Sequence, residues 1–520
     1  MEILAFILYF ATMLGIGLFF FFKDKSTGEK DYFLGGRKMG PFVTAMSAQA
    51  SDMSGWLLMG LPGSIIAFGM GKAWIGIGLG IGTILNWVIV AARLRRFSKA
   101  SGDSITLPQY LTNRFATANP ALKVICAVIF LISFTVYVAS AFNAGTAVFI
   151  AVIPWFKDHQ MLAMIIFAAI VLVYTFLGGY KAVCWTDFFQ GLLMLIALLA
   201  VPIVMVVFGN FDTSFMGEFS TGVSSFNSNL FDASAKDIIS GLGWGLGYFG
   251  MPHILVRFMS INKAKKIKTS ASVAIVWVIL TLGAAALIAY LGRTYLLSDG
   301  SSLAASILPD AKETIFIKIV VDLFPAFIAG LLLSAIIAAS MSTADSQLLV
   351  ASSSFTSDIY KPIIRKNKAS DKEILWVGRI VVLIVSIIGF VIASSGLNNP
   401  GSWASSIMNM VENAWGLFGA AFGPVIILSL FWKRFNYAGA VAGILAGAIV
   451  DICWLVFINN AYGIIETLPA YLESITGIYE IVPGFAIGFI VSVIVTLITK
   501  RPSAEVEKIF ATATDTTIDD

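Results

Sequence analysis

The sequence predicts an all-α polytopic membrane protein of about thirteen transmembrane helices. Of its 520 residues, 58% are hydrophobic and 12% are charged, and the mean hydropathy is +0.89. Globular proteins carry about 25% charged residues on average, so a soluble protein is excluded. Apolar runs of the length that a helix needs to cross a bilayer, about 20 residues, recur along the whole chain.

Each apolar run is expected to be a helix, because a lone helix satisfies its own backbone groups in lipid. The runs are too long and too apolar for barrel strands. The thirteen expected spans cover about residues 3–22, 41–66, 73–93, 121–151, 160–178, 184–208, 237–258, 271–292, 325–349, 375–396, 404–432, 438–458 and 481–499.

Positive charge lies in alternate loops, within residues 23–38, 93–114, 263–268 and 361–372. Intervening loops such as 397–403 and 459–480 contain no Lys or Arg. By the positive-inside rule, the N-terminus is expected outside and the C-terminus inside the cytoplasmic membrane. Residues 1–500 would form one transporter domain, followed by a polar, disordered cytoplasmic tail at 501–520.

The second span contains a polar interruption, SAQASDMSGWLLMGLPG at Ser47–Gly63, with Asp52 near its middle. A carboxylate at that depth costs a few kcal/mol or more unless something faces it. Small residues around Asp52 let the backbone leave a regular helix and turn carbonyls toward a guest. We therefore expect a broken helix that binds a cation or a polar solute. The alternative is an Asp that bonds a neighbouring helix for packing.

The seventh span repeats this feature with GLGWGLGYFGMPHI at Gly241–Ile254. Its five glycines and Pro252 remove helix support and free backbone groups. Two interrupted spans at corresponding positions predict a five-plus-five inverted repeat. The first repeat would cover about 41–208 and the second about 237–432, with extra helices at 3–22, 438–458 and 481–499.

The rest of the composition argues against catalysis. Cys126, Cys184 and Cys453 are too scattered for a disulfide framework or a metal site, and there are only two histidines. No nucleophile–base set stands out, so we expect no enzyme, no cofactor and no nucleic-acid partner. A cation channel remains an alternative from another class, although no filter loop is repeated.

Six motifs along the chain resemble the solute:sodium symporter family. They are GGR at 35–37, the polar stretch at 47–63, FTVYVAS at 134–140, GWGLGYFGMPHILVRFM at 243–259, MSTADSQLLV at 341–350 and FGAAFGPV at 418–425. The resemblance covers about residues 1–500 and implies the leucine-transporter-type fold and sodium-driven uptake by alternating access. It is strongest to members that carry proline; pantothenate, a sugar or another organic acid are the alternative solutes.

The resemblance also implies a sodium site between the first broken helix and the eighth helix of the fold. Its ligands would be the carbonyls of Ala50, Met53 and Ala339 and the hydroxyls of Ser342 and Thr343. The alternative for the two hydroxyls is back-bonding to the preceding helical turn. Asp52 would tune the sodium affinity.

A solute site is implied by a second set of matching positions, namely Ser54, Gly55, Trp56, Tyr137, Trp244, Tyr248, Pro252 and His253. Trp244 and Tyr248 are four residues apart, so they would share one face of an α-helix. The alternative for membrane Trp and Tyr is an interfacial belt.

Five further residues carry weaker implications. Asp187, Asp345 and Ser346 could hold a second sodium ion, or the carboxylates could pair with a nearby Arg or Lys. Arg37 matches an inner-gate residue, with a positive-inside anchor as the alternative. Asp451 is expected to be a packing or oligomer contact.

Overall fold

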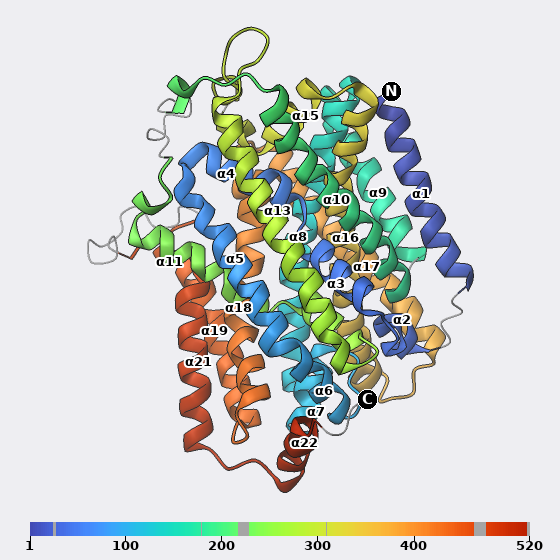
Figure 1. Ribbon diagram of the computed structural model, residues 1–520. Coiled ribbons are helices and arrows are strands. Elements are labelled where there is room, and N and C mark those ends of the chain that lie inside the picture. Colours follow the sequence, from blue (N-terminus) through green and yellow to red (C-terminus); the bar gives the residue numbers. More distant parts are fainter. Residues whose placement is uncertain (24–27, 178, 217–227, 308, 462–474, 517–520) are drawn as a thin grey trace.

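The computed structural model describes the chain except residues 24–27, 178, 217–227, 308, 462–474 and 517–520. Figure 1 shows a bundle of long helices, with the start of α1 at the top of the view and α22 at the bottom. Ten helices in the described part of the chain are long and apolar enough to cross a membrane. They correspond to ten of the thirteen expected spans. The expected spans 41–66 and 237–258 are each split into two helices, and the span at 160–178 forms a shorter apolar helix.

The described residues of the first half of the chain form ten α-helices. They are α1 (Glu2–Lys23), α2 (Glu29–Leu34), α3 (Pro41–Asp52), α4 (Leu61–Phe68), α5 (Ala73–Leu85), α6 (Ala92–Ala100), α7 (Leu107–Arg114), α8 (Ala121–Val152), α9 (Gln160–Leu177) and α10 (Tyr180–Phe208).

The second half forms the remaining described helices. They are α11 (Ala235–Gly243), α12 (Pro252–Ser260), α13 (Ile267–Thr294), α14 (Leu303–Ser306), α15 (Ile315–Leu323), α16 (Ala326–Ser353), α17 (Asp371–Asn398), α18 (Ile407–Phe431), α19 (Tyr437–Cys453), α21 (Ile481–Ile498) and α22 (Ala504–Thr514).

The two broken helices lie in the middle of the bundle. Helix α3 packs against α10, α12, α13 and α16, and the segment between α11 and α12 packs against α5 and α18. Helices α19 and α21 pack against each other and against α18, at the side of the bundle (Figure 1). The first expected repeat ends at residue 208, where α10 ends, and the second begins at residue 237, close to the start of α11 at Ala235. The repeats themselves remain a prediction.

The expectation of a disordered tail is wrong for residues 504–514, which form helix α22 on the surface of α6. Residues 517–520 lie outside the described residues. Ser503 caps the helix by accepting the amide of Val506. Four residues recur at i, i+3, i+4 and i+7: Val506, Ile509, Phe510 and Ala513. This is an amphipathic period, and the polar threonines and aspartates that follow it mask it in the composition of the tail.

Phe510 provides a test of this docking. Its ring lies edge-on to Phe97 of α6 at 5.3 Å between centroids, and the Arg114 guanidinium lies 5.2 Å from its centroid. An aromatic pair contributes about 0.5–1.5 kcal/mol beyond its buried area. We expect Phe510→Ala to open α22 more often and to speed trypsin cleavage after Lys508 about tenfold.

The matched control is Thr512→Ala, which changes an exposed residue of the same helix. Equal cleavage rates in the two variants would show that Phe510 does not hold α22 on α6.

Candidate functional site

The break in the first interrupted helix lies at Met53 and Ser54. Met53 has φ −90° and ψ 85°, outside the helical region. Ser54 donates its amide to Asp52, at 3.2 Å, and Leu57 donates to Ser54, at 3.0 Å. In a regular helix these two amides would bond the carbonyls of Ala50 and Met53. The break therefore frees the carbonyls of Ala50 and Met53, which are two of the sodium ligands that the family resemblance implies.

Gly55 lets α8 pack closely against the break. A Cβ at this position would lie 2.6 Å from the Cβ of Ala144 on α8, which is closer than two carbon atoms can approach. The chain resumes as a wide helical turn at Trp56–Gly60 and then as α4. The Trp56 indole donates to the carbonyl of Asp52 at 3.1 Å and so caps the end of α3.

Helix α16 meets this break with its hydroxyl groups. Ser342 Oγ lies 2.8 Å from the Ala50 carbonyl and 3.2 Å from that of Ala339. Thr343 Oγ1 is buried and has no hydrogen-bond partner among the described residues. Ser342 thus contacts two other predicted sodium ligands, the carbonyls of Ala50 and Ala339. Thr343 follows it on α16 with an oxygen that has no partner among the described residues. Neutral oxygens of this kind, at an unwound helix, suit a sodium ion.

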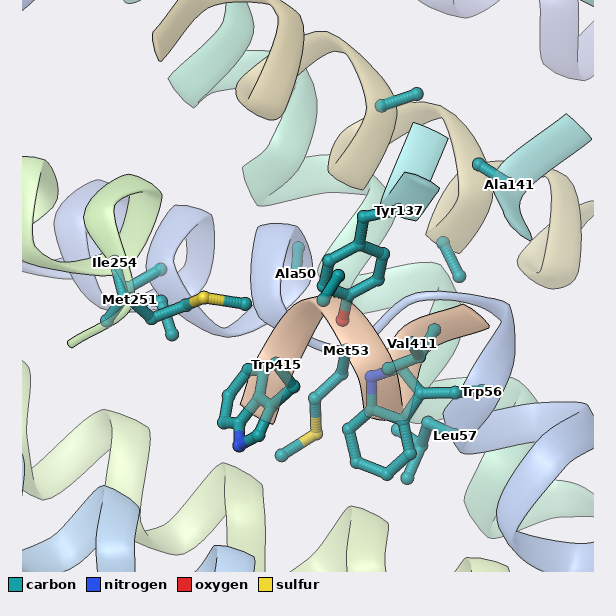
Figure 2. Packing of buried hydrophobic residues seen from close by; sticks show 14 of the residues in the cluster. Ala50, Met53, Trp56, Leu57, Tyr137, Ala141, Met251, Ile254, Val411 and Trp415 are labelled. Atoms are coloured by element: carbon teal, nitrogen blue, oxygen red, sulfur yellow. The ribbon is translucent and has the colours of Figure 1, made fainter. Parts of the chain in front are cut away.

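Asp52 is fully buried beside these oxygens and receives the hydroxyl of Tyr248 at 2.6 Å on Oδ2. Its Oδ1 has no hydrogen-bond partner in the described part of the chain. The hydroxyl of Tyr137 lies 3.4 Å from the Asp52 carbonyl. Figure 2 shows Tyr137 pointing toward the segment that carries Ala50 and Met53. A carboxyl group with one oxygen that has no partner among the described residues therefore lies in the same segment as the freed carbonyls.

The predicted solute residues divide into three groups. Trp56, Tyr137 and Tyr248 meet at Asp52, together with Ser54 and Gly55 of the break. Pro252 begins α12, and His253 packs edge-on against Phe134 at 5.9 Å between ring centroids. Trp244 forms the third group alone.

Trp244 and Tyr248 do not share a face as an α-helical spacing would predict. Residues 244–249 form a 3-10 turn, in which positions three apart eclipse and positions four apart diverge. Tyr248 reaches Asp52, whereas Trp244 stacks on Trp415 and Tyr479 at centroid distances of 6.4 and 5.0 Å. Gly247 lets Trp415 approach this turn closely, because a Cβ there would lie 1.9 Å from the Trp415 indole nitrogen.

The positions proposed for a second sodium ion surround an arginine. The Nη2 atom of Arg257, on α12, lies 3.2 Å from Asp187 Oδ2 and also donates to Ser346. Ser47 of α3 donates to the same Asp187 oxygen at 2.6 Å. Neither carboxylate oxygen of Asp345 has a hydrogen-bond partner among the described residues. The guanidinium thus lies between Asp187 and Ser346.

Arg37 connects three segments at the end of the bundle that carries α22. Its guanidinium donates to Asp103 Oδ1 at 2.7 Å, to Ser98 Oγ at 3.0 Å, and to the carbonyls of Ser104 and Met259 at 2.7 and 2.5 Å. Its backbone φ is 55°, a conformation that costs about 1–2 kcal/mol for a residue with a side chain. The side-chain contacts hold this strained backbone and join the start of α3 to α6 and α12.

Asp103 completes this contact from the loop after α6. Partial burial acts to raise its pKa, but the hydrogen bond from Lys30 and the charge of Arg37 outweigh burial and hold the pKa of Asp103 below its ordinary value. The carboxylate is therefore ionised at neutral pH, as the arginine contact requires.

Comparisons with known proteins identify the fold and the family. Residues 32–447 match the Sodium:solute symporter family. The chain belongs to this family. It is 41% identical over 484 residues to the Sodium/proline symporter of Escherichia coli strain K12, which covers 93% of this chain and 90% of that protein. It is 42% identical over 504 residues to the Sodium/proline symporter of Staphylococcus aureus strain JH9, which covers 96% of this chain and 93% of that protein.

Solved structures of sodium-coupled symporters share the architecture. A Na⁺-coupled sialic acid symporter in a substrate-bound outward-open state superposes with a TM-score of 0.72 at 20% identity, covering 96% of this chain and 98% of that one. A nucleobase-cation-symport-1 family transporter has a TM-score of 0.54 at 12% identity, covering 94% and 99%. The expected leucine-transporter-type fold is confirmed. The family consists of sodium-coupled transporters, so this symporter is a multi-pass membrane protein and not an enzyme.

Two residues that matter for the symporter's core were not assigned a role from the sequence. Arg257 is the only Lys or Arg within the expected span 237–258, and that isolation was a usable signal. Trp415 donates its indole N–H to the Trp244 carbonyl at 2.8 Å and lies edge-on to Tyr248 at 5.0 Å. Nothing in the local sequence of span 404–432 distinguishes it from a packing residue.

Asp52 tests whether the charge at the break serves the coupling ion. Asp52→Asn keeps the shape and the acceptor for Tyr248 but removes the charge, so the sodium concentration for half-maximal uptake should rise by tenfold or more. Asp52→Glu should retain part of the sodium affinity because the charge survives. Sodium titrations of initial uptake, normalised to protein in the membrane, measure both effects.

A packing role predicts the opposite order. Asn would then be nearly harmless, and Glu would be disruptive because of its size in a fully buried position. An Asn variant that transports better than the Glu variant would rule out the electrostatic role.

Proposed function

We propose that this symporter carries out sodium-coupled uptake of L-proline by alternating access. Sodium coupling at this site is supported by the contact between the freed Ala50 carbonyl and Ser342 Oγ at 2.8 Å. The Thr343 hydroxyl, one residue further along α16, has no hydrogen-bond partner among the described residues. The proline half is supported by the 41–42% identity to two sodium/proline symporters over 93–96% of the chain. The coupling ion would be held by Ala50, Met53, Ala339, Ser342 and Thr343, with Asp52 adding attraction.

Proline would bind at the break in α3. As a zwitterion with an apolar ring, it needs aromatic walls and polar partners for its two charged ends. Trp56, Tyr137 and Tyr248 supply ring surfaces around Asp52. The backbone freed at Ser54 and Gly55 supplies polar partners. Pro252 and His253 would bound the site from α12.

The sodium site and the proline site share the same break, which gives a physical reason for coupling. A sodium ion that fixes the carbonyls of α3 also fixes the backbone that receives the solute. Sodium should therefore raise the affinity for proline, and proline should raise the affinity for sodium by the same factor.

We propose a single coupling sodium ion. Arg257 already places a positive charge between Asp187 and Ser346, which favours the pairing alternative for Asp187 over its use in a second sodium site. Arg37 would act as an inner gate, since its contacts close the end of the bundle that carries α22. The charge pattern of the loops supports a cytoplasmic membrane location with the N-terminus outside.

Ser342 and Thr343 test the sodium site. Replacing both by Ala should raise the sodium concentration for half-maximal uptake by about tenfold or more, because a hydrogen bond or contact to a charged partner contributes about 1.5–3 kcal/mol and 1.4 kcal/mol is a factor of ten. The wild-type titration should follow a one-site curve.

Ser340→Ala is the matched control, since that hydroxyl donates to Ile336 within the same helix at 2.8 Å. An unchanged sodium dependence in the double variant, at normal expression, would place the ion elsewhere.

The solute is tested by uptake into proteoliposomes with and without a sodium gradient. Labelled proline, pantothenate, a sugar and an organic acid form the panel. We expect saturable proline uptake that stops when sodium is removed. Saturable uptake of another panel member without proline uptake would refute the substrate, and flux that does not saturate would favour a channel.

A further inference from the structure

A pocket of about 630 Å³ lies along the connection from α21 to α22. This connection runs along the bottom of the view in Figure 1, at the end of the bundle that carries α22. The pocket is lined by the residues just after α7, the start of α19, the last residue of α21 and the first turn of α22. We call it the basal pocket and define it by Phe115, Tyr437, Ile498, Lys500, Arg501 and Val506.

The basal pocket carries positive charge without a counter-ion. Lys500 and Arg501 are the charged residues among its lining, so its formal charge is +2. Both are exposed, and neither side chain forms a hydrogen bond or an ion pair with the described residues. The glutamates of α22, at 505 and 507, do not line the pocket, and Glu507 is paired with Lys433 at 3.0 Å. An anionic guest would therefore meet two available cations.

The backbone that carries these two cations is held in place. Asn436, at the start of α19, is buried. Its Nδ2 donates to Thr499 Oγ1 at 2.8 Å and to the Lys500 carbonyl at 2.9 Å, while its Oδ1 accepts the amide of Gly439 at 2.9 Å. Ser503 fixes the other end of the connection by capping α22. The ammonium and the guanidinium thus extend from an anchored segment.

A buried arginine behind the wall of the basal pocket adds to its positive potential. Arg114 is fully buried, and its Nε donates to the Ser429 carbonyl at 3.0 Å. Its Nη1 and Nη2 atoms have no hydrogen-bond partner among the described residues. The guanidinium lies 5.7 Å from the ring centroid of Phe115, which lines the pocket. A buried charge without an opposite charge costs free energy, and an anion beyond this ring would lower that cost.

The basal pocket begins where the lipid-facing surface of α21 ends. Helix α21 is long and apolar enough to cross a membrane, and Ile494, Leu497 and Ile498 are exposed along its last turns. Ile498 is 77% exposed and also lines the pocket. Cations that directly follow an apolar span lie at the level of the lipid headgroups. A guest that is anionic at one end and apolar at the other therefore matches both surfaces.

We propose that the basal pocket binds the phosphate group of an anionic phospholipid. Lys500 and Arg501 pair with the phosphate oxygens, and an acyl chain lies along the exposed apolar residues of α21. Basic pockets between transmembrane helices on the cytoplasmic side are suited to anionic headgroups. The charge pattern of the loops places this end of the bundle in the inner leaflet. The inference goes beyond the proposed transport function, since it requires neither sodium nor proline.

A free phosphate ion has the same oxygens as the headgroup, but the apolar part of the pocket favours the lipid. Tyr437, Ile498 and Val506 line the pocket together with the two cations. An inorganic ion leaves these residues without a partner, whereas a phospholipid covers them. Two like-charged side chains on an exposed segment also hold a small free ion weakly in water, because solvent screens the attraction.

The test is lipid binding to the full-length protein, measured by native mass spectrometry. The protein in a non-ionic detergent is titrated with dioleoyl phosphatidylglycerol, and the Kd of the first bound lipid is determined. Lys500→Gln together with Arg501→Gln should raise this Kd about tenfold or more, because each cation near an anionic lipid contributes about fivefold. Arg501→Glu, which reverses one charge, should also raise it and replaces the double variant if that variant fails to fold.

The matched control removes the same charge from another loop. Lys366 and Lys368 are exposed in the positively charged loop 361–372 and do not line the basal pocket. Replacing both by Gln should change the Kd less than twofold. An equal loss of binding in the two double variants would show that the lipid responds to net charge alone, and it would overturn the pocket as a site.

Two further titrations identify the source of the phosphate. Dioleoyl phosphatidylcholine should bind at least fivefold more weakly, because its choline group cancels the headgroup charge. A hundredfold excess of inorganic phosphate should displace less than half of the bound phosphatidylglycerol. Full displacement by inorganic phosphate would assign the pocket to a free anion, and equal binding of the two lipids would remove the role of charge; either result overturns the proposal. An unchanged Kd in both pocket variants would do the same.

Discussion

The break in helix α3 is the constraint on which the rest of the structure depends. Backbone groups that leave a helix within the bilayer have no water to bond, so the protein must satisfy every one of them. Trp56 caps the carbonyl of Asp52, and Ser342 takes that of Ala50. Each of these partners comes from a defined position on a neighbouring turn or helix. The need to satisfy the break therefore fixes the approach of α16 to α3 and leaves oxygen atoms concentrated at one point.

The second broken helix shows the same principle with a different solution. Between α11 and α12, glycines allow side chains from α18 to approach the backbone, and Trp415 supplies the donor for the Trp244 carbonyl. Polar ligands gather at the first break, whereas aromatic rings gather at the second. Tyr248 joins the two by donating to Asp52. The core is thus asymmetric in chemistry, with the proposed sodium ligands at the first break and an aromatic cluster at the second.

The sequence predicted both breaks, because their causes are local: a carboxylate among small residues at Asp52, and glycines with Pro252 in the second span. The resemblance to the family brought Ala50 and Ser342 together, which no local pattern could do. Trp244 and Tyr248 would share a face only on an α-helix, and the 3-10 turn at 244–249, which packs against Trp415, could not be foreseen from the local sequence. Arg257 acquires its partners on α3, α10 and α16 only in the tertiary structure.

Arg257 links helices from the first and second halves of the chain, so that these helices can move as one unit. Its guanidinium, on α12, contacts Ser47 of α3 at 3.2 Å, Asp187 of α10 at 3.2 Å and Ser346 of α16. Removing one partner of a buried ion pair costs about 3–5 kcal/mol, so a motion that separates these helices singly is strongly disfavoured. The lower-cost motion keeps the four helices together and breaks contacts elsewhere. The Arg37 contacts lie at the edge of this group and include Asp103, a loop residue whose side chain is 43% exposed, so this contact can exchange with water when it opens. Alternating access would then depend on opening and closing contacts at the ends of the bundle, such as those of Arg37. The region around the proposed sodium site would move as a rigid body.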